Sequence, residues 1–266
     1  MSWIWCNGEF SDGFLSASPS DRGLTNGLGL FETLLAVDGR PVALQPHLIR
    51  MKAGAGRLRW HFDGSRIGLA IVELLRRANL ETGRARVRIA MTAGTGDLGD
   101  LEQGPDALIW VVAAACPPPP ESIAVVTLPF PRNERSPLVG LKCASYAENL
   151  VALDHARLAG AGEGLFFNTR DELCEGATSN VFLVHDGKVM TPPLESGCLP
   201  GTMRERVIAR SEVEERVLSK SDLDAADEIF ITSSTRGVLP VTRVDDRSIP
   251  PGPVSESLRS AAWELG

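Results

Sequence analysis

Hydrophobic and polar positions alternate in several parts of the first half of the chain, and this period of two predicts β-strands. The segments that share the pattern or a short apolar run are 3–10, 31–44, 85–94 and 107–115. Asn7-Gly8 and Asp38-Gly39 are typical two-residue turns, so the first two segments are predicted to be hairpins. The last segment is apolar enough to lie centrally in a sheet.

Helical spacing of apolar residues follows the second hairpin. It predicts helices over 45–60 and 65–80, the second with Ser65 as its N-cap. In the second half, strands are predicted over 122–128, 164–169, 179–191, 214–218, 228–234 and 240–244. Helices are predicted there over 146–162, 202–211, 219–227 and 254–265. Because the strands cluster rather than alternate strictly with helices, the pattern favours an α+β fold over a doubly wound sheet.

A run of four prolines between Cys116 and Ser122 is the best internal break. Consecutive prolines continue neither a helix nor a sheet ladder and behave as a stiff extended spacer. The chain is therefore predicted to have an N-terminal domain over 1–116, a proline-rich linker over 117–122 and a C-terminal domain over 123–266.

Composition narrows the class of protein. The 266 residues include 27 Lys and Arg against 34 Asp and Glu, for a net charge of −7, and 43% are hydrophobic. This balance argues against nucleic-acid binding and against disorder. No apolar run is long enough to span a membrane, and the five cysteines are scattered without a C-x-x-C pair. We therefore expect a cytoplasmic enzyme with reduced cysteines and no membrane or nucleic-acid partner.

Familiar metal, nucleotide and hydrolase motifs are missing from the sequence. The four histidines are too far apart for a local metal site, so no metal is expected. Neither G-x-G-x-x-G, a Walker lysine motif nor a G-x-S-x-G serine elbow occurs. Three groups of candidate residues remain.

Lys142, between Leu141 and Cys143 and ahead of a predicted helix, is the first candidate. A lysine that forms a Schiff base has to lie where enough of its amine is neutral to attack an aldehyde. The same residues also fit a lysine at a strand end whose stem covers apolar surface. The local pattern leaves both interpretations open.

Glu175 in DELCEGATSN is the second candidate. A pyridinium nitrogen needs a nearby carboxylate to stay protonated, and the cationic ring is the strong electron sink. The small and polar residues that follow would let the backbone approach a ring, although EGATSN also fits a polar turn.

Phosphate-binding groups form the third signal. A helix predicted to begin at Thr202 and Met203 would offer unpaired N–H groups to an anion. Ser233 and Ser234 would add hydroxyl donors at a strand end, and Arg50 would add a charged fork. Each feature also has a plain structural interpretation, namely a capped helix, a polar loop and an exposed helical arginine.

Taken together, these stretches resemble the fold-type IV pyridoxal-phosphate enzymes, the class-IV aminotransferase family. The motifs that carry the resemblance, in chain order, are DRGLTNGLGLFETLLAVDG, HLIRM, LK with its following helix, EGATSNVFLVHDGKVMTPPL, CLPGTMR and DEIFITSSTRGVLPV. The resemblance implies a small N-terminal and a larger C-terminal α/β domain, a homodimer, and pyridoxal 5′-phosphate bound between the domains.

The resemblance also implies a role for individual residues. Lys142 is similar to the Schiff-base lysine that shuttles the substrate proton, and Glu175 to the carboxylate on the pyridine nitrogen. The implied phosphate ligands are Arg50, the backbone of Thr202 and Met203, and Ser234. Leu199 stands where a leucine packs on the ring, and Phe31 where the family has a pocket aromatic.

Several side chains are candidates to hold the substrate. Arg86 and Arg88 alternate with apolar residues on a predicted strand, so they share one face. If that face lines the pocket they would bind the substrate carboxylate, and if it meets water they are solvated charges. Thr235 and Arg236 are further candidates at the sheet end. Tyr146, the only tyrosine, fits either a cofactor contact or helix packing.

Three functions follow as hypotheses. The first is a transaminase that moves an amino group between an amino acid or amine and a keto acid. The second is aminodeoxychorismate lyase, in which the same lysine releases pyruvate and yields 4-aminobenzoate. The third is a cofactor-binding scaffold without activity, which the presence of both Lys142 and Glu175 disfavours.

Overall fold

The computed structural model describes residues 3–97 and 99–261. The chain forms two compact units: the first takes Met1–Pro118 with Leu141–Ser145, and the second takes Pro119–Gly140 with Tyr146–Gly266. The main part of the first unit thus ends inside the predicted linker 117–122. The unit also includes Leu141–Ser145, which the sequence-based division placed in the C-terminal domain, because this segment bonds to a strand of the first unit.

The first unit is a six-stranded antiparallel sheet in the order β2-β1-β6-β5-β3-β4. Its strands are β1 (Trp3–Cys6), β2 (Glu9–Asp12), β3 (Gly29–Val37), β4 (Arg40–Pro41), β5 (Arg84–Thr92) and β6 (Ile109–Ala115). Both predicted hairpins are confirmed. Asn7 and Asp38 have φ of 47° and 46° and each precedes a glycine with positive φ, as turns matched to strand twist require.

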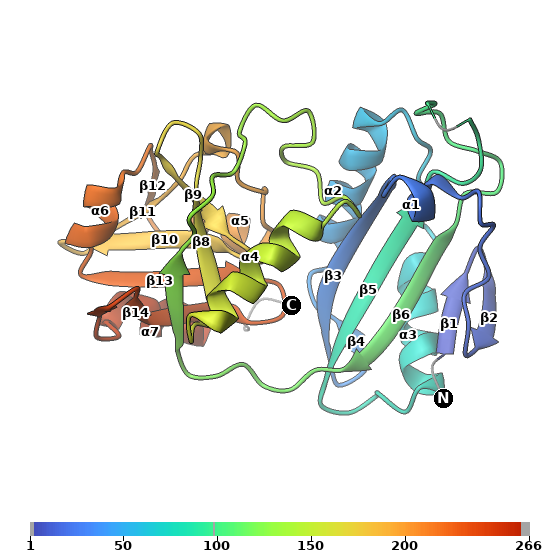
Figure 1. Ribbon diagram of the computed structural model, residues 1–266. Helices are drawn as coiled ribbons and strands as arrows, with labels where there is room; N and C mark the ends of the chain where they lie inside the picture. The colour runs from blue at the N-terminus through green and yellow to red at the C-terminus, as the bar shows by residue number, and fades with distance from the viewer. Residues whose placement is uncertain (1–2, 98, 262–266) are drawn as a thin grey trace. The chain divides into compact units, whose positions relative to one another are not determined.

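Helices cover one face of this sheet. They are α2 (Leu44–Arg57) and α3 (Ile67–Arg77), and the short helix α1 (Arg22–Thr25) precedes β3 in the chain. α2 packs on β3, and α3 packs on β1 and β6 (Figure 1). The predicted Ser65 cap is wrong: Arg66 occupies the N-cap position, and the Ser65 N–H donates to Asp63 instead. The buried core between helices and sheet includes Leu34, Val87 and Leu74.

The second unit is a nine-stranded mixed sheet in the order β12-β11-β10-β13-β14-β7-β8-β9, with β15 added on β14. Its strands are β7 (Ile123–Thr127), β8 (Glu163–Phe167), β9 (Leu173–Gly176), β10 (Asn180–His185), β11 (Lys188–Thr191), β12 (Val213–Glu215), β13 (Glu228–Ser233), β14 (Gly237–Val244) and β15 (Arg247–Ser248). Its helices are α4 (Ala147–Leu158), η1 (Leu194–Ser196), α5 (Thr202–Ile208), α6 (Lys220–Ala225) and α7 (Pro253–Ala261). The predicted end of the last helix, after 261, lies outside the described residues.

Both faces of the second sheet are buried. On one face, Val181 and Leu183 of β10 belong to a core that includes Leu223 of α6. On the other, Phe182 of β10 stacks on Phe230 of β13 beneath α5 and α7. This double burial explains why the central strands have near-continuous apolar runs. Within the described ranges, no helix combines the length and hydropathy needed to cross a membrane.

Candidate active site

Lys142 lies in the extended segment Leu141–Ser145, which pairs with the start of β3 in the first unit. Phe31 N donates to Lys142 O at 2.9 Å, and Ala144 N donates to Gly29 O at 2.8 Å. Lys142 Nζ lies 4.4 Å from the centroid of the Phe31 ring, and Phe31 is 3% exposed. The amine of the predicted Schiff-base lysine is therefore held against a buried aromatic face.

Arg88 contacts the same ring from β5. Its Cζ lies 3.9 Å from the Phe31 centroid. β5 pairs Arg88 with Thr33, two residues along β3 from Phe31, so these side chains share one face of the sheet. Arg86 lies on this face too, and both arginines are exposed. The structure thus brings Arg88 and Lys142 to one aromatic ring.

Arg50 lies on α2 and forms a two-pronged salt bridge with Glu32 of β3. Arg50 Nε donates to Oε1 at 2.8 Å, and Nη2 donates to Oε2 at 2.6 Å. His47 Nδ1 lies 2.7 Å from the same Oε2, and the side chains of Glu32 and His47 are each 1% exposed. Burial alone would raise the pKa of Glu32, but the bonds from Arg50 and His47 outweigh it and hold that pKa below its usual value.

Glu32 and His47 are not among the site residues expected from the sequence. A signal was present, because Glu32 falls on the face of its strand that otherwise carries the apolar Leu30 and Leu34. His47 and Arg50 are three residues apart on a helix and so share a side of it. A charge in an apolar pattern, opposite such a pair, indicates a buried polar cluster.

Glu175 lies on β9 in the second unit, and both carboxylate oxygens have partners. Oε2 accepts from Leu199 N at 2.9 Å, and Oε1 lies 3.4 Å from Arg132 Nε. The Arg132 guanidinium lies 4.0 Å from the Phe166 ring centroid and also pairs with Glu148 of α4. Its Nε and Nη2 are buried without a hydrogen-bond partner among the described residues. Arg132, which follows the apolar run 123–130, is not among the site residues expected from the sequence.

Two cysteines flank the Glu175 contact. Cys174 precedes Glu175, Cys198 precedes Leu199, and both thiols are buried in the same apolar cluster. Burial raises the pKa of Cys174 far above its usual value and that of Cys198 to about 12. Both thiols therefore stay protonated and form an apolar wall beside the carboxylate.

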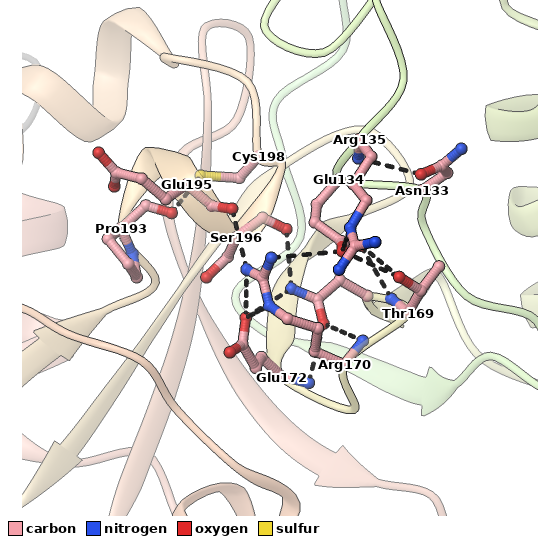
Figure 2. A network of polar contacts seen from close by, with 11 residues as sticks. Asn133, Glu134, Arg135, Thr169, Arg170, Glu172, Pro193, Glu195, Ser196 and Cys198 are labelled. Atoms are coloured by element: carbon pink, nitrogen blue, oxygen red, sulfur yellow. Dashed lines mark hydrogen bonds and ion pairs between the residues drawn. The ribbon is translucent and has the colours of Figure 1, made fainter.

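A polar network holds the loop around Glu134, which follows Arg132 in the chain (Figure 2). Glu134 accepts from Thr169 N at 3.0 Å and from Thr169 Oγ1, and it pairs with Arg170. Burial opposes ionisation of Glu134, but these bonds and its own backbone N–H hold its pKa below its usual value. Arg170 also donates to Glu195 O at 3.2 Å, which links the network to η1, the short helix before α5.

The predicted phosphate residues of the second unit meet at the start of α5. Thr202 begins this helix, and its Oγ1 lies 3.0 Å from Ser234 Oγ at the end of β13. Met203 is buried, and its side chain lies in the core between α5 and the sheet. The structure thus brings the CLPGTMR and ITSSTRG segments together.

Gly201, the N-cap of α5, has no room for a side chain. A Cβ there would lie 1.9 Å from Asn180 Oδ1. Asn180 Nδ2 donates to Leu199 O at 2.8 Å. Asn180 therefore fixes the turn from Leu199 to Gly201, and this turn supplies the N–H that meets Glu175.

Arg236 is directed into a buried polar cluster. Its Nη2 donates to Glu163 Oε2 at 2.6 Å and to Thr178 Oγ1 at 2.9 Å, and its Nε donates to Ser233 Oγ at 3.1 Å. Glu163 is fully buried. Thr235 lies in the turn between β13 and β14 and is half-buried.

Tyr146 is the N-cap residue of α4, and its hydroxyl lies 3.4 Å from Ala177 O. Asn149 Nδ2 donates to the same carbonyl at 2.7 Å. The start of α4 is thereby attached to the EGATSN segment, two residues after Glu175.

Known proteins share this sequence pattern. The family model described as amino-transferase class IV matches residues 29–244. A "Putative branched-chain-amino-acid aminotransferase" of Methanocaldococcus jannaschii is 32% identical over 92% of this chain and 89% of that protein. Aminodeoxychorismate lyase of Bacillus subtilis is 29% identical over 91% of this chain and 87% of its own length.

A solved structure supports the fold and the cofactor class. The T.th. branched-chain aminotransferase, in complex with N-(5′-phosphopyridoxyl)-L-glutamate, superposes with a TM-score of 0.87 at 27% identity. The match covers 98% of this chain and 93% of that one. The α+β fold, the fold-type IV assignment and pyridoxal phosphate as cofactor, all expected from sequence, are confirmed. The chain belongs to the class-IV aminotransferase family of pyridoxal-phosphate-dependent enzymes.

Proposed function

We propose that this enzyme moves an amino group between an α-amino acid and a keto acid, with Lys142 as the residue that binds the cofactor covalently. The observation that carries the proposal is that Lys142 Nζ and Arg88 Cζ both lie within 4.4 Å of the centroid of the Phe31 ring. An α-amino acid carries its carboxylate on the carbon that bears the amine. A reactive amine and a guanidinium that contact the same aromatic ring suit a substrate of that shape.

The residues present fit pyridoxal phosphate. When bound, the cofactor supplies an aldehyde for an amine and a ring that takes up electrons. Lys142 offers the amine, and Glu175 offers a carboxylate for the ring nitrogen. The proposed phosphate ligands are Arg50, Ser233, Ser234 and the backbone of Thr202 and Met203. The Leu199 side chain is proposed to pack on the ring.

Each side chain has a proposed task toward the substrate. Lys142 moves the proton of the reacting carbon, and Phe31 shields the amine from water. Arg88 binds the carboxylate, and it is preferred to Arg236 because it contacts the same Phe31 ring as Lys142. Arg86, Thr235 and Tyr146 are secondary candidates for contacts further along the substrate.

A half-reaction tests this proposal. Full-length enzyme loaded with cofactor is mixed with one amino acid and no keto acid, and its visible band should shift to the absorbance of the aminated cofactor. Branched-chain amino acids are the first substrates to try, given the names of the M. jannaschii relative and of the T.th. enzyme. Arg88→Met should slow this step for amino acids while sparing a simple amine. Equal losses for both would rule out Arg88 as the carboxylate residue.

Aminodeoxychorismate lyase is the second candidate, and the B. subtilis relative supports it. The same lysine would serve, because removal of the substrate proton also precedes pyruvate release. Pyruvate that accumulates over many turnovers from aminodeoxychorismate, with no half-reaction on amino acids, would favour the lyase over the transaminase.

We also propose that the enzyme is a cytoplasmic homodimer. Leu150, Val151 and Leu158 of α4 are exposed apolar side chains of the kind that subunit interfaces cover. No cysteine within residues 3–97 and 99–261 forms a disulfide, as is typical of cytosolic proteins. Light scattering on the purified enzyme would give twice the mass of the 28.6 kDa chain, and a monomer mass would exclude the dimer.

A further inference from the structure

In the first unit, Arg50 is held by a buried carboxylate, that of Glu32, which in turn contacts His47. An arginine does not need these two partners in order to bind a phosphate. The Glu32 carboxylate accepts two bonds from one edge of the Arg50 guanidinium, through Nε and Nη2. A guanidinium has five N–H donors in a rigid plane, and three of them lie outside this fork. Glu32 therefore fixes the plane of Arg50 and the direction in which its opposite edge points.

His47 fixes the carboxylate in turn. Its Nδ1 lies 2.7 Å from Glu32 Oε2, the oxygen that also accepts from Arg50 Nη2 at 2.6 Å. Because an ionised carboxylate only accepts, the Nδ1 proton points to Glu32. Glu32 is 1% exposed, so it has no room to exchange these partners for water. The three side chains form one oriented unit.

Stability alone is a weak reason for such a cluster. Taking charges out of water costs free energy, and apolar residues of similar volume often replace a buried ion pair without loss. Around Glu32 the rest of the core is apolar, with Leu30 and Leu34 on the same strand face. An orienting role explains why charged residues lie there. A long arginine side chain that is free in solution loses rotamer freedom when it binds an anion, and an arginine already fixed by Glu32 loses less.

We propose that Glu32 and His47 are positioning residues for Arg50, which they hold ready to bind the phosphate group of the cofactor. This inference rests on the proposed role of Arg50. It assigns to Glu32 and His47 a share in the affinity for phosphate, and none in the covalent bond at Lys142.

The test compares two forms of the cofactor on the full-length protein. Pyridoxal phosphate and pyridoxal carry the same aldehyde and ring, and only the first carries phosphate. Dissociation constants for both are measured from the visible band of the lysine-bound form, and their ratio reports the phosphate contribution. Arg50→Met should abolish most of the preference for pyridoxal phosphate. Glu32→Gln should lower the preference about three- to tenfold, the factor that corresponds to ordering one long side chain on binding.

Glu73→Gln is the matched control. Glu73 also accepts from two arginine side chains, those of Arg76 and Arg77, but on the exposed surface of α3 in the same unit. Its substitution should leave the ratio unchanged. If Glu32→Gln does not fold, His47→Gln provides the same measurement, with a smaller expected decrease. A cofactor-free protein is also titrated with inorganic phosphate, which should raise the melting temperature of the wild type more than that of Glu32→Gln.

Each outcome has a distinct meaning. Equal loss of affinity for both cofactor forms in Glu32→Gln would show a purely structural role and overturn the inference, as would an unchanged ratio. Failure of the proposed function looks different, since Lys142→Ala would then keep the visible band. A wild type that binds both forms equally would remove the role of Arg50, and the inference with it.

Discussion

The Arg50–Glu32 pair of the first unit and the Arg132–Glu175 pair of the second unit have opposite designs. In the first, the arginine is the proposed ligand and the carboxylate supports it. In the second, the carboxylate is the proposed ligand and the arginine supports it. The first is a close fork at 2.8 and 2.6 Å, whereas the second has one contact at 3.4 Å and two guanidinium nitrogens without hydrogen bonds to the described part of the chain.

The difference follows from what each group would bind. A phosphate is held by directed N–H groups, so an arginine in this role gains from being fixed by a second edge. A carboxylate that meets a ring N–H has to stay ionised and correctly oriented. The longer Arg132 contact to Oε1 supports the negative charge of Glu175, and the Leu199 N–H, which donates to Oε2, sets its orientation.

The two pairs should differ most in the free energy of unfolding that is lost when the carboxylate of each pair is removed. Glu32→Ala leaves Arg50 and His47 beside a buried cavity, and we expect a loss of about 3–5 kcal/mol in the free energy of unfolding. Glu175→Ala leaves Arg132 paired with Glu148, so the expected loss is about 1–2 kcal/mol. Urea denaturation of the cofactor-free proteins measures both values. Equal losses would mean that the two pairs are not different in kind.

Gly201→Ala tests the turn that positions Leu199, whose N–H donates to Glu175. The new Cβ has to displace Asn180, which lies 1.9 Å away, and the turn at Leu199 should shift with it. We expect a loss of about 1–3 kcal/mol. Gly56→Ala in α2 is the matched control, because nothing lies within 4 Å of its added Cβ. In a helix that change should stabilise by about 0.5–1 kcal/mol, and a Gly201→Ala protein as stable as this control would contradict the tight fit.

Acid should weaken the first pair. The pKa of Glu32 is lower in the folded protein than its usual 4.5, so the stability from ionisation is full above that value and is lost as pH falls through the folded pKa. The Glu32→Gln variant lacks this dependence. Urea midpoints measured between pH 7 and 3 should therefore fall less steeply in the variant than in the wild type. Parallel curves would show that the pKa of Glu32 is not lowered in the folded protein.

The smallest effect concerns the cysteines beside Glu175. Burial raises the pKa of Cys198 to about 12 and that of Cys174 further, so neither thiol should react with iodoacetamide in the native protein at pH 8. Cys116 is only half-buried and serves as the internal control. Mass spectrometry identifies which cysteines are alkylated. If Cys198 were labelled at the same rate as Cys116, the buried thiols beside Glu175 would be accessible to solvent.

Local sequence patterns predicted much of the fold. They did not predict contacts between residues that are distant in the sequence. The hairpins at Asn7 and Asp38 were predictable because each turn is a property of two adjacent residues. The motif order identified the family and its cofactor. Arg132 was missed because its partners, Glu148 and Glu175, follow in separate later segments. The Ser65 cap failed because Asp63, two residues earlier, takes the Ser65 N–H.

The short strand-like segment around Lys142 also has a consequence for synthesis and dissection of the chain. The first unit is discontinuous, since Leu141–Ser145 joins it only after Pro119–Gly140 of the second unit. A fragment cut at the proline run would lack the lysine and leave the backbone of Gly29 and Phe31 without these partners. On the ribosome the first unit stays incomplete until residue 145 emerges. The two units are therefore interleaved in the gene and are not interchangeable modules.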